Sequence, residues 1–487
     1  MRGPLKAVGL LAAASLALAL PTSAALARPG AVSRAAATFT VATTSDAPHE
    51  LPLDGSCTST LPGGACTLRA AIQAANFAGG GPHTINLSTV GTYTLSVLGT
   101  GEDNAATGDL DINGTTVAIA NTSGGRVAID GNHTDRAIAV GPLAPAKVSI
   151  TGVTIENGLI DGPPGITIVG GGVDIGLGSE GTLNDVVFVG NRSAFAGGGL
   201  TSAGQVTLNN VTFSGNVAVF SGGFGNVGFA TLNNVVFSGN FGFFSNGGFG
   251  NLGLASLNNV LITRNAAAVL DGGIGNGDKA TLTLTNVTIS HNQAAMNAGM
   301  GTLGKSTLTN VTISGNTASM FSPGFGNLGT ATLTNVTITG NTGGGSVGGI
   351  GAGLPLQGRL LPVASVLAIL GIKVPEPGPT IVRNTIVSSS LPAACAVPII
   401  SQGSNLEFPG STCGFTPQLG DLVGRNPLLG LLASNGGFAP THALLRGSPA
   451  IDAVRSGCPP TTDERGVRRP QGARCDIGAY ERKAKKK

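Results

Sequence analysis

An eight-residue unit occurs seven times along the middle of the chain at a nearly constant interval. Its copies run from NDVVFVGN at 184–191 to TNVTITGN at 334–341, and successive copies are 24 to 27 residues apart. A fixed period of this length indicates a solenoid, because each repeat needs its neighbours to bury an apolar face. The asparagines that end the copies are Asn191, Asn216, Asn240, Asn265, Asn292, Asn316 and Asn341.

Apolar residues within each repeat indicate short strands. Val235 and Phe237 alternate with polar residues, as in a strand. Leu232 lies three positions before Val235, and this odd step predicts a corner at Asn234. A Gly-rich segment such as GGFGN at 222–226 supplies a third strand. We therefore predict an all-β fold, a right-handed parallel β-helix of the pectin-lyase-like kind, in which equivalent residues of successive coils form ladders.

Composition supports this fold class. Gly contributes 79 of the 487 residues, and each Gly disfavours a helix by about 1 kcal/mol relative to Ala. The 41% hydrophobic and 10% charged residues exclude a disordered chain. A leucine-rich repeat would need a helix-forming half, and a propeller blade about 40 residues. The formal net charge of +3 indicates no nucleic-acid partner.

The first residues are typical of an export signal. Arg2 and Lys6 precede an apolar run over 7–20, and small residues follow through Ala27. This run is shorter than the roughly 20 residues that a membrane span needs. We expect residues 1–27 to be a removed signal peptide, with a secreted or cell-surface location and no transmembrane segment in the mature chain.

The six cysteines form three pairs that are close in sequence. An even number of cysteines in an exported chain predicts disulfides. Zinc is the competing interpretation, but no CxxC motif occurs and no His lies close to a pair. The predicted bonds are Cys57–Cys66, Cys395–Cys413 and Cys458–Cys475.

The repeat divides the chain into a body and two ends. The segment CTLRAAIQAANFAG at 66–79 has helical periodicity and is expected to cap the N-terminal end. An apolar, Pro-flanked insertion is expected to be a helix on the side of the solenoid, with a strand-rich insertion as the alternative. The expected divisions are a signal peptide (1–27), an N-terminal cap (28–83), a β-helix (84–390) with an insertion at 354–380, a disulfide-stapled C-terminal cap (391–481) and a solvated basic tail (482–487).

Some asparagines also lie in N-V-T glycosylation sequons. We interpret them as corner residues of the ladders, with their amides bonded to the backbone of neighbouring coils and too far inside for glycosylation. They are Asn210, Asn286, Asn310 and Asn335.

Carboxylates are the groups that a glycan-cleaving enzyme on this fold would need. Between 186 and 350 the only acids are Asp271 and Asp278, which leaves the regular body without a catalytic pattern. Asp130 and Glu156 each follow an Ile of a strand and are the best candidates for a stacked carboxylate pair. We favour turn and corner roles for these acids. The other early acids are Asp109, Asp111, Asp135, Asp161 and Asp174.

Another charged group lies near the C-terminus. We expect its members to form a salt-bridge network that closes the solenoid, with a ligand or ion site as the alternative. They are Asp463, Arg465, Arg468, Asp476 and Glu481.

Three groups of motifs resemble known families. CTLRAAI (66–72) resembles the CSLREA domain of secreted bacterial β-helix proteins, although Ala70 stands where that domain has Glu. SPAIDA (448–453), DERG (463–466) and CDIGAYE (475–481) resemble the ending of choice-of-anchor Q proteins. The FSGN and GGFGN units resemble repeats of chlamydial polymorphic membrane proteins, which are surface adhesins. No LPxTG-type sorting signal is present.

Two function classes compete. We expect an exported, non-catalytic, adhesin-like scaffold that binds a polysaccharide or a cell-surface protein, as a monomer and without a cofactor or metal. The alternative is a polysaccharide lyase or glycoside hydrolase that uses Asp130 and Glu156 in the early coils, and only this alternative would involve Ca²⁺.

Overall fold

The computed structural model describes residues 36–51, 53–162, 169–345, 347–351, 378–396, 399–415, 418–455 and 457–484. Within these residues the chain is built of β-strands and one α-helix, α1 (Leu68–Ala78). The predicted signal peptide and nearly all of the predicted insertion lie outside them. None of the described helix residues forms a segment long and apolar enough to cross a membrane.

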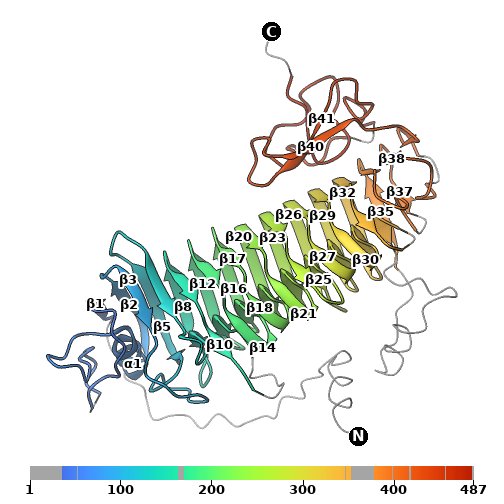
Figure 1. The fold of residues 1–487 in the computed structure, drawn as a ribbon. Helices are drawn as coiled ribbons and strands as arrows, with labels where there is room; N and C mark the ends of the chain where they lie inside the picture. Colours follow the sequence, from blue (N-terminus) through green and yellow to red (C-terminus); the bar gives the residue numbers. More distant parts are fainter. Residues whose placement is uncertain are drawn as a thin grey trace, which may run out of the picture.

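The strands stack into three parallel sheets, which confirms the predicted right-handed parallel β-helix (Figure 1). The long sheet contributes one or two strands to each coil. Its strands are β1 (Thr38–Val41), β2 (Gly80–Leu87), β3 (Gly91–Thr94), β5 (Thr115–Asn121), β6 (Val127–Asp130), β8 (Lys147–Thr151), β9 (Thr154–Glu156), β12 (Glu180–Asn184), β13 (Val187–Val189), β16 (Gln205–Asn209), β17 (Thr212–Ser214), β20 (Phe229–Ser238), β23 (Leu254–Thr263), β26 (Thr281–Ser290), β29 (Lys305–Ser314), β32 (Thr330–Thr339), β35 (Thr380–Arg383), β36 (Ile386–Ser388), β37 (Ile400–Ser401), β38 (Leu406–Phe408) and β39 (Leu422–Val423).

Two smaller sheets complete the coils. The side sheet has the strands β10 (Leu159–Ile160), β14 (Arg192–Ala196), β18 (Val217–Phe220), β21 (Phe241–Ser245), β24 (Ala266–Ala267), β27 (Gln293–Met296), β30 (Thr317–Phe321) and β33 (Thr342–Gly343). The glycine sheet has the strands β4 (Leu110–Ile112), β7 (Ile138–Val140), β11 (Val173–Ile175), β15 (Leu200–Ser202), β19 (Phe224–Asn226), β22 (Phe249–Asn251), β25 (Ile274–Asn276), β28 (Met300–Thr302), β31 (Phe325–Asn327) and β34 (Ile350–Gly351).

The predicted asparagine ladder lies inside the solenoid, between the long sheet and the side sheet. The Asn240 Nδ2 group donates to the Phe213 carbonyl (3.0 Å) and to Asn265 Oδ1 (2.9 Å). Its Oδ1 accepts from the backbone N–H and the Nδ2 of Asn216, at 3.0 and 2.9 Å. The same pattern runs from Asn191 to Asn341, so the buried amides satisfy polar groups of the adjacent coils.

Apolar ladders fill the rest of the interior. The rings of Phe188, Phe213 and Phe237 stack on successive coils, with centroids 4.7 and 4.8 Å apart. Leu232 and Val235 are also fully buried, one on each side of the corner predicted from their odd spacing. One repeat therefore supplies inward residues from both arms of a bent strand.

The corner residue itself is an asparagine in the left-handed region. Asn234 has a φ of 56° and donates from Nδ2 to Asn210 Oδ1 at 3.0 Å. The amides of this series therefore bond to one another, whereas we expected bonds to backbone groups. The prediction that the sequon asparagines are inaccessible is wrong for Asn210, which is exposed. Asn310 and Asn335 are buried beneath the C-terminal residues.

The central Gly of the GGFGN segments has a steric cause. A side chain at Gly275 would meet Asn246 and Asp271, which lie over the outer face of the glycine sheet. Asn246 and Asp271 both have a φ of 58°, and this left-handed turn directs them across the neighbouring strands. The repeat therefore needs Gly wherever the turn residue of an adjacent coil covers the strand.

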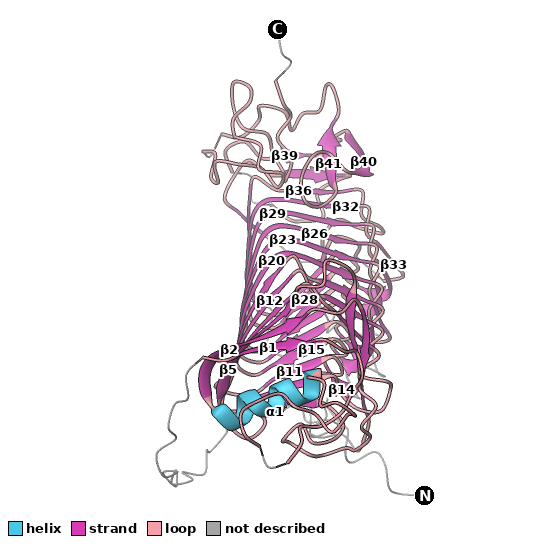
Figure 2. Cartoon of the chain, turned by 90° about the vertical axis from the view of Figure 1, so that its left-hand side faces the viewer, coloured by secondary structure: helices cyan, strands magenta, loops and turns pink. Residues whose placement is uncertain are grey.

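The helix α1 covers the N-terminal end, as predicted (Figure 2). Thr67 caps it by accepting a hydrogen bond from the Ala70 N–H at 3.1 Å. The β-helix nevertheless begins earlier than predicted, because β1 pairs in parallel with β2 from Thr38 onward. Four residues of β1 carry little sequence signal, and only their pairing across the cap reveals the strand.

The C-terminal boundary also differs from the prediction. The long sheet continues through β39 to Val423, so the β-helix extends beyond residue 390. The following residues, 429–484, form what we call the C-terminal module, with the antiparallel pair β40 (Leu429–Ala433) and β41 (Thr441–Leu444). This module packs along the outer face of the long sheet, whereas a cap closing the end was expected (Figure 1). The module covers the polar residues Thr288, Thr312 and Thr337 of the long sheet. The repeat period alone does not predict this contact.

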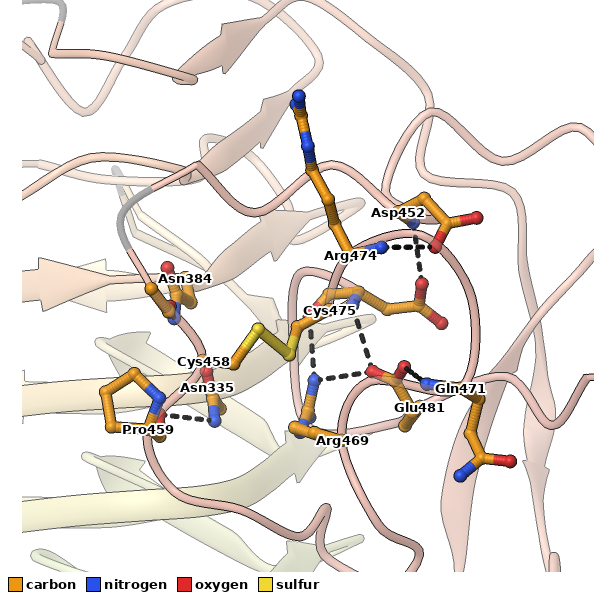
Figure 3. The surroundings of a disulfide bond; sticks show 12 residues. Asn335, Asn384, Asp452, Cys458, Pro459, Arg469, Gln471, Arg474, Cys475 and Glu481 are labelled. Carbon is orange, nitrogen blue, oxygen red and sulfur yellow. Dashed lines mark hydrogen bonds and ion pairs between the residues drawn. A yellow bond between two sulfur atoms is a disulfide. The ribbon is translucent and has the colours of Figure 1, made fainter.

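All three disulfides join the predicted pairs. Cys57–Cys66 lies beside the N-terminus of α1, and Cys395–Cys413 lies in the last coils. Cys458–Cys475 lies within the C-terminal module (Figure 3). The described residues contain no free cysteine.

We predict that Asn240→Ala destabilises the protein by about 3–5 kcal/mol. The substitution leaves two buried donors of Asn216 and the carbonyl of Phe213 without their partners, and each such loss costs about 1–3 kcal/mol. Denaturant unfolding followed by circular dichroism measures the change. Ser319→Ala, at an exposed site on β30, is the control, and equal midpoints for the two variants would contradict the role of the ladder.

Candidate functional site

The early coils gather several of the predicted carboxylates around Arg136. Arg136 Nε lies 2.7 Å from Asp109 Oδ2, and its Nη1 lies 3.7 Å from Asp174 Oδ2. Asp135 accepts a hydrogen bond from the Arg136 N–H at 2.8 Å. Strands β7 and β11 pair side by side, which brings residues 135, 136 and 174 together. Sequence reasoning named these acids but not their meeting point.

Asp111 extends this acidic cluster beneath a loop. It lies on the outer face of β4, where Ala139 of β7 separates it from Asp174 of β11. Its Oδ2 accepts from the Ala105 N–H at 2.8 Å, and its Oδ1 is buried without a hydrogen-bond partner. The Asp111 side chain is fully enclosed, so this carboxyl is out of reach of a substrate.

Burial dominates the protonation of the cluster. It raises the pKa of Asp111 to about 8, with a further contribution from the charge of Asp109. Burial also raises the pKa of Asp135 and of Asp174 to about 6 each, and opposing Arg136 lowers both. Asp111 therefore keeps its proton at neutral pH, while Asp135 and Asp174 bind protons as the pH falls through about 6, because desolvation disfavours the charged carboxylates.

The N-terminal cap is tied to this cluster through Arg69 of the CTLRAAI segment. Arg69 is fully buried and pairs with Asp46, Nε to Oδ1, at 2.8 Å. It also donates to the carbonyl oxygens of Gly108 and Asp109, at 2.7 and 3.1 Å. These bonds give the acidic cluster a structural role, since they fix the loop that covers Asp111. Ala70 is completely buried, in a place that leaves no solvent access for a carboxylate.

Asp130 and Glu156 are register partners on β6 and β9, as their spacing suggested. Glu156 Oε2 is 2.6 Å from Arg126 Nη2, and Asp130 Oδ1 accepts from the Asn132 N–H at 2.8 Å. Both carboxylates thus have local partners, one in a surface ion pair and one in a turn. Asp161 is exposed at the edge of the described residues.

Asp271, in the regular body, is held by the turn over the glycine sheet. Asn297 Nδ2 donates to its Oδ1 at 3.1 Å. Burial raises the pKa of Asp271 to about 7. The turn residues at the equivalent position on the neighbouring coils are asparagines and serines, which supply no second acid.

The charged residues of the C-terminal module form two buried ion pairs. Arg465 Nη2 lies 2.6 Å from Asp463 Oδ2. Arg469 Nη1 lies 3.1 Å from Glu481 Oε2, and Figure 3 shows this second pair. Arg469, and not the predicted Arg468, is the buried partner, while Arg468 is exposed. Adjacent arginines give sequence reasoning no means to tell which one faces inward.

Glu464, which sequence reasoning missed, fastens the module to the long sheet. Its Oε1 and Oε2 accept from the hydroxyls of Thr288 and Thr312, each at 2.6 Å. Burial holds the pKa of Glu464 well above its ordinary value. The Ser314 hydroxyl and His442 Nε2, 2.8 Å apart, extend this polar interface.

Exposed apolar side chains form a patch on the other arm of the bent strands, before the Asn234 bend, whereas Glu464 contacts the arm after it. We call this patch the corner patch. It consists of Val227, Phe229, Leu252 and Leu254, at the corner between the glycine sheet and the long sheet. Phe229 and Leu254 are register partners and are 59% and 48% exposed. Exposed apolar patches of this kind mark interaction sites on soluble proteins.

A second apolar group, which is half-buried, lies on the side sheet. The rings of Phe195, Phe220 and Phe244 follow one another on successive coils, with centroids 5.3 and 5.4 Å apart. Phe243 beside them is largely exposed. Strand alternation in the irregular side-sheet segments was too weak to predict this row.

Across the described ranges, no three His, Cys, Asp or Glu residues form a group that could hold a metal ion.

Comparisons with known proteins give no family. No protein-family model and no curated protein matches the chain. Among solved structures, the chain is similar to the crystal structure of pectate lyase Pel9A, with a TM-score of 0.41, 16% identity, and coverage of 93% of this chain and 98% of that one. A similarity at this level gives no basis for assigning that protein's activity here.

We predict that the protein becomes less stable as the pH rises from 5 to 9. The pKa values of Asp135, Asp174 and Asp111 lie above their ordinary value of 3.8, so the folded state holds protons that the unfolded chain releases. The stabilisation is complete below about pH 4 and is lost as the pH passes about 6 and then about 8.

Thermal unfolding across this pH range tests the prediction. Asp111→Asn should remove much of the decrease above pH 6, because its amide cannot ionise. Asp278→Asn, at an exposed position, should follow the wild type. A parallel pH profile for Asp111→Asn would show that another group is responsible.

Proposed function

We propose that this protein is an exported, non-catalytic β-helix scaffold that binds a polysaccharide or a surface protein on its outer faces. The observation that carries the proposal is the corner patch, where Phe229 and Leu254 stand exposed on adjacent coils. Exposing large apolar side chains is unfavourable in water, and their burial by a partner yields about 25 cal/mol per Å².

The environment of the carboxylates supports binding over catalysis. A general acid or base must come within about 3 Å of the reacting group. Asp109, Asp111 and Asp135 are almost completely buried, and Glu156 is paired with Arg126. The lyase or hydrolase alternative, with Asp130 and Glu156 as its catalytic pair and Ca²⁺ as its cofactor, has less support.

The proposal of export rests on the leader-like first residues and on the three disulfides, which favour an oxidising compartment. The resemblance of CTLRAAI and CDIGAYE to segments of secreted β-helix proteins points the same way. An adhesin-like role at a cell surface is consistent with a rigid solenoid that presents long, flat faces.

A panel of polysaccharides and cell-surface extracts, tested for binding and for depolymerisation with Ca²⁺ present, examines the proposal. We expect binding without turnover. The double substitution Phe229→Ser and Leu254→Ser should weaken binding about tenfold, because central apolar anchors contribute 1–2 kcal/mol or more. The fold should be unaffected, since both side chains are exposed.

Leu431→Ser is the matched control, because Leu431 is 89% exposed but lies on the C-terminal module. Depolymerisation that disappears in Asp130→Ala or Glu156→Ala would instead establish the enzyme alternative. Unchanged binding by the double variant would show that the corner patch is not the binding surface.

A further inference from the structure

A straight row of hydroxyl groups runs along the outer face of the long sheet, next to the corner patch. Its members are consecutive register partners on eight coils, from β8 to β32, and all are Ser or Thr. We call it the hydroxyl row. It consists of Ser149, Thr182, Thr207, Thr231, Ser256, Thr283, Thr307 and Thr332.

The row is regular and open to solvent. Parallel strands repeat at about 4.8 Å, so the eight hydroxyls extend over about 34 Å. Thr231, Ser256 and Thr332 are exposed, and the other members are half-buried between their neighbours. β-Branched Thr side chains have few χ1 rotamers, which keeps the hydroxyls in a repeating orientation.

The same sheet provides one example of a chemical group that two such hydroxyls bind together. Beyond the bend, the Thr288 and Thr312 hydroxyls lie on adjacent coils and both form a hydrogen bond with the Glu464 carboxyl group, one at each oxygen at 2.6 Å. One carboxyl group therefore spans two successive coils. Thr283 and Thr307 are register partners on the strands β26 and β29, as Thr288 and Thr312 are. They lie before the bend, on the arm that the C-terminal module does not cover.

Charge in this part of the chain favours a carboxylate ligand. Residues 186–350 contain four Lys and Arg against two Asp, an excess of two positive charges, whereas residues 100–185 contain three against eleven acids. Lys305 is exposed two residues before Thr307, on the same outward face. An ammonium beside donating hydroxyls attracts a carboxylate through charge-assisted hydrogen bonds.

We propose that the hydroxyl row, with Thr283, Thr307 and Thr332 at its C-terminal end and Lys305 beside them, binds an extended, carboxylate-bearing polysaccharide whose chain lies along the axis of the solenoid. The inference rests on the proposed function and specifies its ligand. A uronic-acid polymer presents acidic and hydroxyl groups at a repeat close to one sugar per coil. A row that is straight over eight coils suits a long periodic chain better than the irregular acidic surface of a protein.

Affinity electrophoresis of the full chain through gels containing alginate tests the inference, with hydroxyethylcellulose as the neutral polymer. We expect retardation by alginate, little retardation by the neutral polymer, and weaker binding at high salt. The triple substitution Thr283→Val, Thr307→Val and Thr332→Val keeps the side-chain shape but removes the hydroxyls. It should reduce the affinity for alginate at least tenfold, and Lys305→Met should reduce it independently.

Thr317→Val is the matched control, because Thr317 is exposed on the side sheet and should leave binding unchanged. Circular dichroism and thermal unfolding confirm that the triple variant is folded. Equal retardation of the triple variant and the wild type would overturn the assignment to the hydroxyl row while leaving the proposed function intact. Equal retardation by the neutral polymer, or none by alginate, would overturn the ligand class. If the panel shows no binding to any polysaccharide or surface extract, the proposed function fails as well.

Discussion

The buried asparagine ladder is the interaction on which the rest of the structure depends. In each coil the chain turns between the long sheet and the side sheet. At this turn, not all backbone N–H and C=O groups can form hydrogen bonds with neighbouring strands. The amide of Asn240 satisfies groups on the two adjacent coils, and equivalent asparagines occupy this position on seven coils. An unsatisfied buried polar group costs about 1–3 kcal/mol, so every repeat must keep this residue and its spacing.

A fixed spacing has consequences for the outer surface. Once the ladder sets the register, residues that occupy equivalent positions stack on every face, inside and outside. Phe188, Phe213 and Phe237 stack inside, and the Ser and Thr side chains of the hydroxyl row stack outside. The same register that stabilises the fold therefore produces flat, periodic surfaces, a geometry suited to binding an extended polymer.

The C-terminal module contacts one part of this periodic surface. It covers the polar arm of the long sheet around Thr288 and Thr312 through Glu464, a carboxyl group that bridges two coils. Burying a lone carboxyl group is tolerated here because two hydroxyls form hydrogen bonds with it and because its raised pKa keeps it neutral over a wider pH range. The module is thus attached to the side of the β-helix through polar contacts with the face that it covers.

The sequence by itself determined the solenoid, because a period near 25 residues and the odd step from Leu232 to Val235 admit few other folds. It also determined the disulfide partners, which are neighbours in the chain, and the register of Asp130 with Glu156. Only the tertiary structure decided how far the β-helix extends, since β1 and β39 are too short to leave a periodic signal. It alone brought Asp109, Asp135 and Asp174 around Arg136, buried Arg469 in place of Arg468, and laid the C-terminal module along the side of the long sheet. These features depend on contacts between segments far apart in the chain, and no local pattern of residues encodes which distant face a segment will meet.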